Sequence, residues 1–173
     1  MAHVLDPIPS SVSGRNEALA LVVKVVALSA AGIVAGGTFA VWRGYPPQGL
    51  SPGTFVEMQQ DAIRGMNVLF PVVGAVAILA TLILALMERG GRRAWLLAAV
   101  GLFVVAALVT RFGNQPINAV VMGWSPDAPP PGWEALRDRW WTLHLIRTAV
   151  TCLGYLALLL GCLMPSTRRP PSV

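Results

Sequence analysis

Two ionisable side chains lie inside the last apolar stretch of this 173-residue chain, at a spacing that places them on one helical stripe. His144 and Arg147 are three residues apart, which is nearly one helical turn. Trp140 precedes them, and Thr151 and Tyr155 follow them on the same stripe. An arginine at this depth in a membrane costs roughly 3 kcal/mol unless it has a partner. We therefore expect Arg147 to face the interior of a helix bundle and to line a polar pocket there.

The stripe suits two kinds of chemistry and one purely structural role. His144 is suited to act as a general base, or as the axial ligand of a haem iron against which Trp140 would pack. Arg147 is suited to hold an anion such as a phenolate, a carboxylate or a haem propionate. The structural alternative is that Arg147 extends to the membrane interface while His144 bonds only a loop carbonyl. The residues by themselves leave these alternatives open.

Four amide side chains are candidates to join this pocket. Asn114 and Asn118 follow the third apolar stretch and would face the same way if the helix continued through them. Either they line the mouth of the pocket beside His144, or they belong to ordinary helix-stop and turn chemistry. Gln59 and Asn67 are eight residues apart, about two helical turns, and are expected to share a face.

The elements that must position these side chains are apolar helices. The chain is 55% hydrophobic and only 12% charged, with a mean hydropathy of +0.63, whereas soluble domains carry about 25% charged residues. Four stretches have the length needed to cross a hydrocarbon core of roughly 30 Å. They are Leu19–Trp42, Met66–Met87, Ala94–Thr110 and Trp141–Met164. We predict an all-α fold, a bundle of four transmembrane helices in a lipid bilayer.

A short amphipathic helix is predicted between spans one and two. It begins at Ser51, which is followed by a proline, and it places Phe55, Met58 and Ile63 near one face. Gln60 falls with the charged residues on the other faces. Such a helix is typical of a segment that lies at the membrane interface or covers the end of a bundle.

The predicted organisation is a single membrane domain with two tails. Residues 1–17 form a mobile N-terminal tail, residues 18–164 the four-span domain, and residues 165–173 a C-terminal tail. Arginines gather in the turn Glu88–Arg93 and near both ends of the chain. The positive-inside rule therefore predicts both termini in the cytoplasm, with the protein in a plasma or inner membrane.

Several functions and partners are disfavoured by the composition. The net charge of +5 comes from basic residues that flank the spans, and no continuous basic face predicts nucleic-acid binding. Cys152 and Cys162 would lie roughly 15 Å apart along one helix, too far to form a disulfide. With one usable histidine and no carboxylate cluster in the spans, a zinc or di-iron centre is not expected. Four spans bury little surface among themselves, so we expect a homo-oligomer.

Three motifs, in order within residues 25–160, resemble those of the anthrone-oxygenase-like four-helix membrane proteins. The family's signatures are MQ…N…F, N-x-P-L/I-N and W…W…H-x-x-R-T. The matching residues are Met58-Gln59 with Asn67 and Phe70, then Asn114-Gln-Pro-Ile-Asn118, then Trp133 with Trp140 or Trp141 and His144-x-x-Arg147-Thr148.

The resemblance implies oxidation of an apolar aromatic or polyketide-type small molecule, since some relatives convert anthrones to anthraquinones. It implies a catalytic set made of His144, Arg147, Asn114 and Asn118. It implies a cofactor-binding set made of His144, Arg147, Trp140, Gln59 and Asn67, with His144 on the haem iron. The cofactor is expected to be haem, or otherwise none. Haem is favoured, because a deprotonated anthrone reacts with triplet dioxygen unaided only if its carbanion is unusually stabilised. The alternative is a non-catalytic membrane partner, or a small-molecule binder or transporter, that uses the same pocket.

Overall fold

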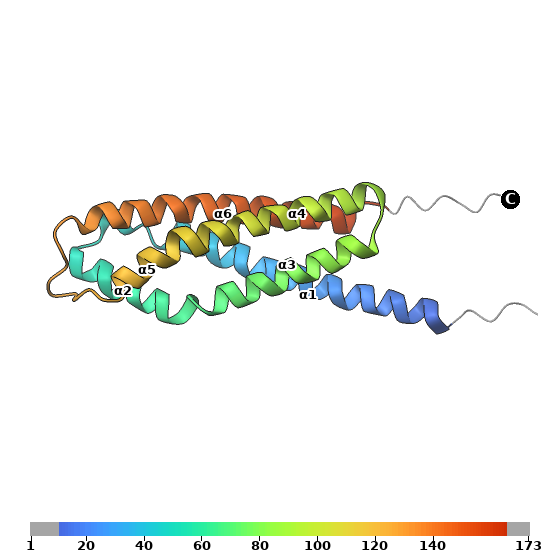
Figure 1. Cartoon of the computed structure of the whole chain (residues 1–173), viewed down its shortest axis with the longest axis horizontal. Coiled ribbons are helices and arrows are strands. Elements are labelled where there is room, and N and C mark those ends of the chain that lie inside the picture. The colour runs from blue at the N-terminus through green and yellow to red at the C-terminus, as the bar shows by residue number, and fades with distance from the viewer. Residues whose placement is uncertain (1–10, 166–173) are drawn as a thin grey trace, which may run out of the picture.

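The computed structural model describes residues 11–165 as a bundle of long helices (Figure 1). The parts of the predicted tails at 1–10 and 166–173 lie outside the described residues. The helices are α1 (Ser11–Gly44), α2 (Pro52–Met66), α3 (Leu69–Met87), α4 (Gly90–Val109), α5 (Gln115–Val121) and α6 (Trp133–Leu163). A short 3-10 helix, η1 (Pro47–Gly49), lies between α1 and α2, and a π-helical turn, η2 (Thr110–Asn114), joins α4 to α5. The predicted all-α fold is confirmed.

Four segments of the described chain are long and apolar enough to cross a membrane. They are Asn16–Gly49, Leu69–Met87, Gly90–Val121 and Trp133–Leu163. Large apolar side chains such as Leu79 and Leu153 are more than half exposed on the outside of the bundle. Because lipid chains favour an apolar outer surface, this arrangement suits a bilayer, and the predicted four-span bundle is confirmed.

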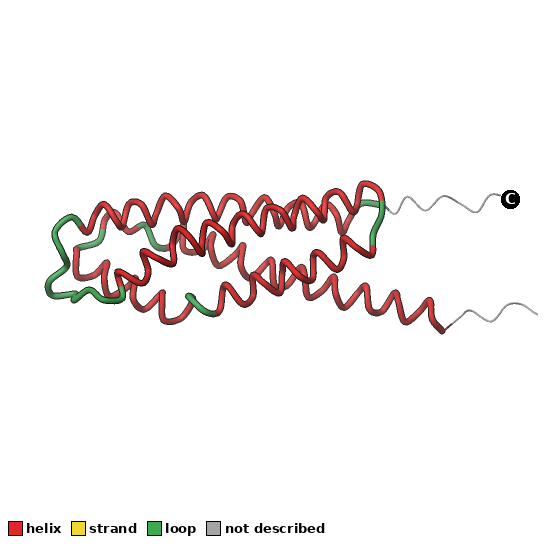
Figure 2. Tube along the Cα trace, in the orientation of Figure 1, coloured by secondary structure: helices red, strands yellow, loops and turns green. Residues whose placement is uncertain are grey.

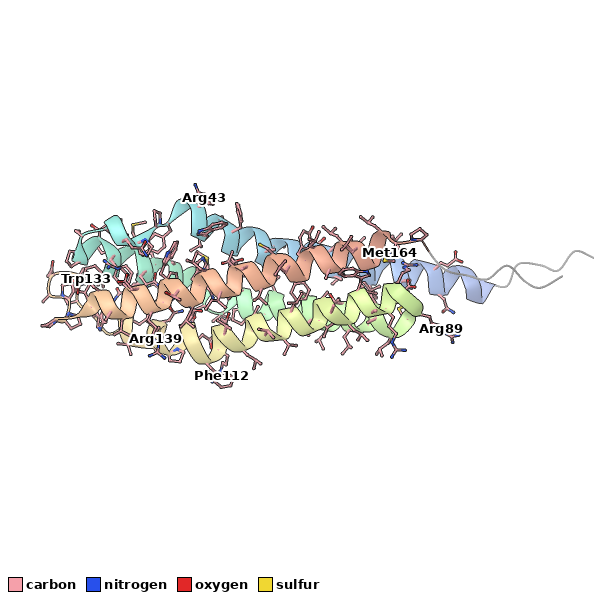
Figure 3. The ribbon with its side chains drawn as sticks, turned by 90° about the horizontal axis from the view of Figure 1, so that it is seen from above. Arg43, Arg89, Phe112, Trp133, Arg139 and Met164 are labelled. Carbon is pink, nitrogen blue, oxygen red and sulfur yellow. The ribbon has the colours of Figure 1, made fainter. Side chains whose placement is uncertain are left out.

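The two ends of the bundle differ in what connects the helices. At one end, here called the turn end, the start of α1 and the end of α6 lie near the two-residue connection between α3 and α4 (Figures 1 and 2). Arg89 and Met164 mark this end in Figure 3, and Trp133 marks the opposite one. The opposite end, here called the loop end, holds α2, α5 and the connections 45–51 and 122–132. Both termini of the described chain therefore lie on the same side.

Small residues let the helices approach closely in the half of the bundle nearer the turn end. The buried core there consists mostly of alanines from α1, α3, α4 and α6, with a few larger side chains. Gly161 of α6 packs against Leu96 of α4, and a Cβ atom added at Gly161 would lie 2.8 Å from Leu96 Cγ. Gly154 meets Phe103 in the same way. This half therefore has little room for a ligand.

Several helix boundaries differ from those expected from hydropathy, among them the start of the last helix, which begins at Trp133 rather than Trp141. Helix α1 begins at Ser11, inside the segment assigned to the N-terminal tail. Span two is expected from Met66, but α2 ends there and α3 begins at Leu69. This places Pro71 in the first turn of α3, where its missing N–H needs no partner. The third span does not stop at Thr110, because helix continues through η2 and α5 to residue 121.

Helix α2 forms where it is predicted and buries Phe55 and Ile63, but its buried face also includes Gln60 and excludes Met58. Ser51 caps it by accepting from the Thr54 backbone N–H. The buried residues are Phe55, Val56, Gln59, Gln60 and Ile63, whereas Met58 is 43% exposed. The prediction for Met58 and Gln60 was therefore wrong. The reason is hydrogen bonding, since Gln60 Nε2 donates to the carbonyls of Val121 and Trp124 at the end of α5.

Candidate functional site

Six of the seven predicted site residues line one cavity in the half of the molecule nearer the loop end. Gln59 comes from α2 and Asn67 directly follows it, Asn118 comes from α5, and the other three come from α6. They are Gln59, Asn67, Asn118, Trp140, His144 and Arg147. Gln59 and Arg147 are 88 positions apart in the sequence, yet they line the same cavity.

Asn118 is the centre of an amide network that ties these helices together. Its Oδ1 accepts from the indole Nε1 of Trp140 at 2.8 Å and from Gln59 Nε2 at 3.4 Å. Its Nδ2 donates to Asn67 Oδ1 at 3.0 Å. Gln59 and Asn67 were expected to share a face, and in the structure Asn118 forms hydrogen bonds with both of them.

Asn114 has a different place from Asn118. It is fully buried, and its Nδ2 donates to the backbone carbonyl of Trp140 at 3.0 Å. It does not line this cavity or the pocket that adjoins it. The two asparagines hold Trp140 by two different groups, Asn114 by the carbonyl and Asn118 by the indole N–H. The geometry of Asn114 is that of a positioning residue rather than one that touches a ligand.

His144 is completely buried and both of its ring nitrogens have partners. Nδ1 faces the guanidinium of Arg147, with Nε at 3.2 Å and Nη2 at 3.0 Å. Because arginine can only donate, Nδ1 must be the acceptor and the hydrogen must sit on Nε2. Nε2 lies 3.2 Å from the Thr38 carbonyl and 3.4 Å from Thr148 Oγ1. The imidazole is therefore the neutral Nε2–H tautomer, and Nδ1 holds its one in-plane lone pair.

Aromatic rings fix the orientation of the imidazole. The ring of Trp140 is stacked on His144 with a centroid separation of 5.2 Å and an interplanar angle of 4°. Trp141 lies against the same imidazole at 5.5 Å and 25°. The carbon Cζ of Arg147 is 5.9 Å from the centre of the Trp140 ring. Four neighbouring side chains of α6 thus pack against one another around the imidazole.

Arg147 has no carboxylate partner in the described part of the chain, where the ion pairs join Arg64 to Asp61, Arg92 to Glu88 and Arg137 to Asp138. The guanidinium is half-buried and its hydrogen-bond partner is the neutral imidazole. A charged group in an apolar bundle normally has a counter-charge or a water-filled cavity. Arg147 therefore leaves a positive charge facing the cavity without a protein anion to balance it.

The cavity has two adjoining lobes of different character. The polar lobe has a volume of about 220 Å³ and is lined by the amide network, His144 and Tyr45. The lobe called apolar here has a volume of about 230 Å³ and extends along α3 and α4, past Phe103 and Ala106, and its lining also includes Arg111, Gln115 and Thr151. The residues common to both linings are Thr38, Phe70, Pro71, Thr110 and Arg147. The guanidinium of Arg147 therefore stands where the two lobes meet.

Sequence reasoning missed three residues that belong to the site. Thr38 accepts from the imidazole through its backbone carbonyl, so its side-chain type carries no signal. Thr148 follows Arg147 in the sequence motif, but only the structure shows that its hydroxyl lies beside Nε2 of His144. Tyr45 lines the polar lobe from the connection after α1. Its position before two prolines gives no indication that the chain turns it back into the bundle.

The surroundings of His144 do not fit a haem ligand as they are arranged. An axial histidine needs a nitrogen lone pair directed at the iron. The one such lone pair of His144 is on Nδ1 and accepts from Arg147. A haem would have to displace this guanidinium, which stands between the two lobes. Within residues 11–165 no group of three or more His, Cys, Asp and Glu side chains converges on a metal-sized site. Haem binding stays a prediction from the sequence.

Comparison with known proteins agrees with the motifs. Neither the curated proteins nor the solved structures gave a significant match. Residues 60–157, more than half of the chain, match the family model described as anthrone oxygenase. The matched range contains the amide, tryptophan, histidine and arginine positions of the site, except Gln59, which lies one residue outside it. The chain therefore belongs to the anthrone oxygenase family.

Proposed function

We propose that this protein oxygenates an apolar aromatic substrate of the anthrone type without a bound cofactor. The observation that carries the proposal is the pairing of Arg147 with His144. A guanidinium without a carboxylate partner in the described chain donates to the only free lone pair of a neutral imidazole. An anion holder and a base thus lie within hydrogen-bond distance of each other beside an apolar cavity.

Substrate binding would release the base. A ketone or phenol oxygen of the substrate accepts from Arg147, and the guanidinium turns away from Nδ1 to make that bond. The freed Nδ1 then takes a proton from the activated carbon of the substrate. The negative charge moves onto the oxygen that Arg147 holds, and the Thr38 carbonyl continues to accept from Nε2–H of the imidazolium. Preorganised donors of this kind supply a large part of catalysis in apolar sites.

The overall reaction balances without an external reductant. The substrate carbanion and dioxygen combine, and the peroxide that forms takes a proton to give a hydroperoxide on that carbon. Loss of the second hydrogen from the carbon breaks the O–O bond and releases water, which leaves a ketone. A CH₂ group and one O₂ are thereby converted to C=O and one H₂O. The four electrons that reduce O₂ come from the substrate carbon itself.

The remaining site residues position the reacting groups. Trp140 holds the imidazole plane by stacking, and Asn114 and Asn118 hold Trp140. The apolar lobe, lined by residues such as Phe103 and Ala106, would receive the aromatic rings and exclude water from the carbanion. The chemistry therefore needs both lobes, with Arg147 where they meet.

A non-catalytic binder would use the same contacts without oxygen uptake. Transport is less favoured by the geometry, because the apolar lobe borders the close-packed alanine core of the turn half. A transported molecule needs a path to the other side, and this half of the bundle is held together by small residues in direct contact.

The test is oxygen uptake by protein in lipid nanodiscs supplied with anthrone. Wild-type protein is expected to consume one O₂ per anthraquinone formed, well above the rate in empty nanodiscs. His144→Phe keeps a ring against Trp140 but has no base, and general-base catalysis contributes about 100-fold or more. The variant should therefore fall close to the empty-nanodisc rate. His144→Gln, which keeps an acceptor for Arg147, should lose the same activity.

Ile146→Ala is the matched control, because Ile146 lies on the same helix and is 46% exposed on the outer surface. It should retain wild-type turnover. Full activity in both His144 variants would contradict the proposal. A Soret band in the wild-type absorption spectrum that His144→Phe removes would also contradict it, since haem would then be the cofactor.

A further inference from the structure

Two polar atoms in the polar lobe have no partner in the structure. Gln59 is 1% exposed, and its Oε1 is buried without a hydrogen bond. The hydroxyl of Tyr45 is also buried without one. Both residues line the polar lobe. A buried polar group that stays unpaired is costly, so a native structure normally provides it with a partner.

The identity of the unpaired atom on Gln59 is fixed by a chain of hydrogen bonds. The indole N–H of Trp140 can only donate, so the atom of Asn118 that it meets must be the oxygen. That oxygen also faces Gln59, so Gln59 must present its amide nitrogen to Asn118. The carbonyl oxygen Oε1 is then the group left without a partner. A rotated Gln59 amide would place two oxygens against each other.

The missing partner of Gln59 must therefore be a hydrogen-bond donor. No nearby amide donates to it in this structure, where the Nδ2 of Asn118 donates to Asn67. The guanidinium of Arg147 is engaged with His144. Tyr45, whose ring lies edge-on to Trp140 with centroids 6.4 Å apart, offers a second group that can donate or accept. An acceptor and a hydroxyl together match an alcohol or phenol.

We propose that the polar lobe recognises a hydroxyl group on the substrate, which donates to Gln59 Oε1 and is also bonded by Tyr45. The inference rests on the proposed function for the aromatic scaffold, and it deepens it. The preferred substrate is a hydroxylated ring system with two polar points. One is the oxygen held by Arg147, and the other is a hydroxyl in the polar lobe. Gln59 and Tyr45 are then specificity-determining residues.

The experiment measures binding rather than turnover, with two inert product analogues. These are the hydroxymethyl and ethyl derivatives of anthraquinone, substituted at the same ring carbon, which are similar in shape and differ in one donor. Dissociation constants are measured with wild-type protein and variants in nanodiscs of the same lipid. Partitioning of each compound into lipid cancels when the preference is compared between two proteins.

The preference is the ratio of the dissociation constants of the ethyl and hydroxymethyl compounds. This ratio should be at least about fivefold larger for wild-type protein than for Gln59→Met, because a buried unpaired acceptor is costly. Tyr45→Phe should reduce the preference as well. Glu57→Gln is the matched control, since Glu57 is exposed on the same helix and lines neither lobe, and it should keep the wild-type ratio. Binding of the ethyl compound with at least the wild-type affinity will show that each variant is folded.

An equal preference in wild type, Gln59→Met and Tyr45→Phe would overturn the inference, and a water molecule would then be the partner of Gln59. The outcome is independent of oxygenation. Protein that shows the expected preference but consumes no O₂ would retain this inference and contradict the proposed function. Protein that consumes O₂ but shows no preference for the hydroxymethyl compound would retain the proposed function and contradict this inference.

Discussion

The turn half and the loop half of this bundle are built from different side chains for different tasks. In the turn half, alanines and two glycines of α6 bring four helices into direct contact. In the loop half, tryptophans, amides, His144 and Arg147 surround the polar lobe, and the apolar lobe extends from there to Ala31, Ala77 and Phe103 of the alanine core. One half gains stability from close packing, and the other uses hydrogen bonds to keep space open.

The comparison shows how a small membrane protein can carry a polar site. In a bilayer, unsatisfied polar groups are costly, so the amides of the loop half pair with one another, with Trp140 and with backbone carbonyls. Only a few groups are left without protein partners within residues 11–165. The buried ones are Gln59 Oε1 and the Tyr45 hydroxyl, which belong to residues that line the polar lobe, and Asn114 Oδ1, which does not. The turn half has almost no polar groups to satisfy, and this lets it act as a rigid support.

The largest expected effect is at Arg147, where the loop half loses its charge. Arg147→Met keeps most of the side-chain length and should lower oxygenation about 100-fold, because a donor to the developing oxyanion is removed. Folding should be retained, since a charge is removed from an apolar bundle. The measurement is O₂ uptake with anthrone, together with the thermal midpoint. Arg139→Ala, an exposed position on the same helix, should change neither.

An intermediate effect is expected from a substitution in the turn half. Gly161→Val places methyl groups against Leu96, where even a Cβ atom is too close, and overpacking costs about 1–3 kcal/mol. The thermal midpoint should fall, while the dissociation constant for an anthraquinone ligand stays near the wild-type value. Gly101→Val is the control, because a Cβ atom there meets nothing within 4 Å. Loss of ligand binding without loss of stability would show that the two halves are not separate.

The smallest expected effect comes from a single hydrogen bond in the loop half. Trp140→Phe keeps the ring against His144 but removes the N–H that Asn118 accepts, and this should cost about 1 kcal/mol of stability. It also frees the Asn118 amide to turn over. The preference for the hydroxymethyl ligand should therefore weaken. Trp141→Phe, whose indole N–H has no hydrogen bond in the described structure, should leave both quantities unchanged. Equal effects of the two substitutions would argue against the amide relay.

Hydropathy predicted the four spans, because each span contains enough apolar residues to be distinguished from the polar connections. It could not predict where helices end within those connections. The segment Thr110–Val121 has polar residues and Pro116, yet it stays helical because Asn114, Ile117 and Val121 are buried against other helices. Tertiary contacts thus override the local stop signals. The same cause moved Gln60 from the predicted outer face to the interior.

The α6 part of the site was predictable because a single helix carries it. Spacing by itself places Trp140, His144 and Arg147 on one face, and the structure brings all three to the same lobe. The partners from other helices were less accessible. Thr38 acts through its backbone carbonyl, and Tyr45 reaches the lobe only because the chain reverses after α1. Their roles depend on packing that one sequence does not display.

The π-helical turn at Thr110–Asn114 makes the amide face of α5 depend on a single codon. A π turn contains one residue more than the α-helical turn that it replaces. Removing that residue would rotate everything after it by about 100° and shift it by about 1.5 Å. Asn118 would leave Trp140 while the apolar pattern of the four spans stayed intact. Within this architecture, a one-residue deletion could erase or restore the pocket chemistry in one evolutionary step, without rebuilding the membrane scaffold.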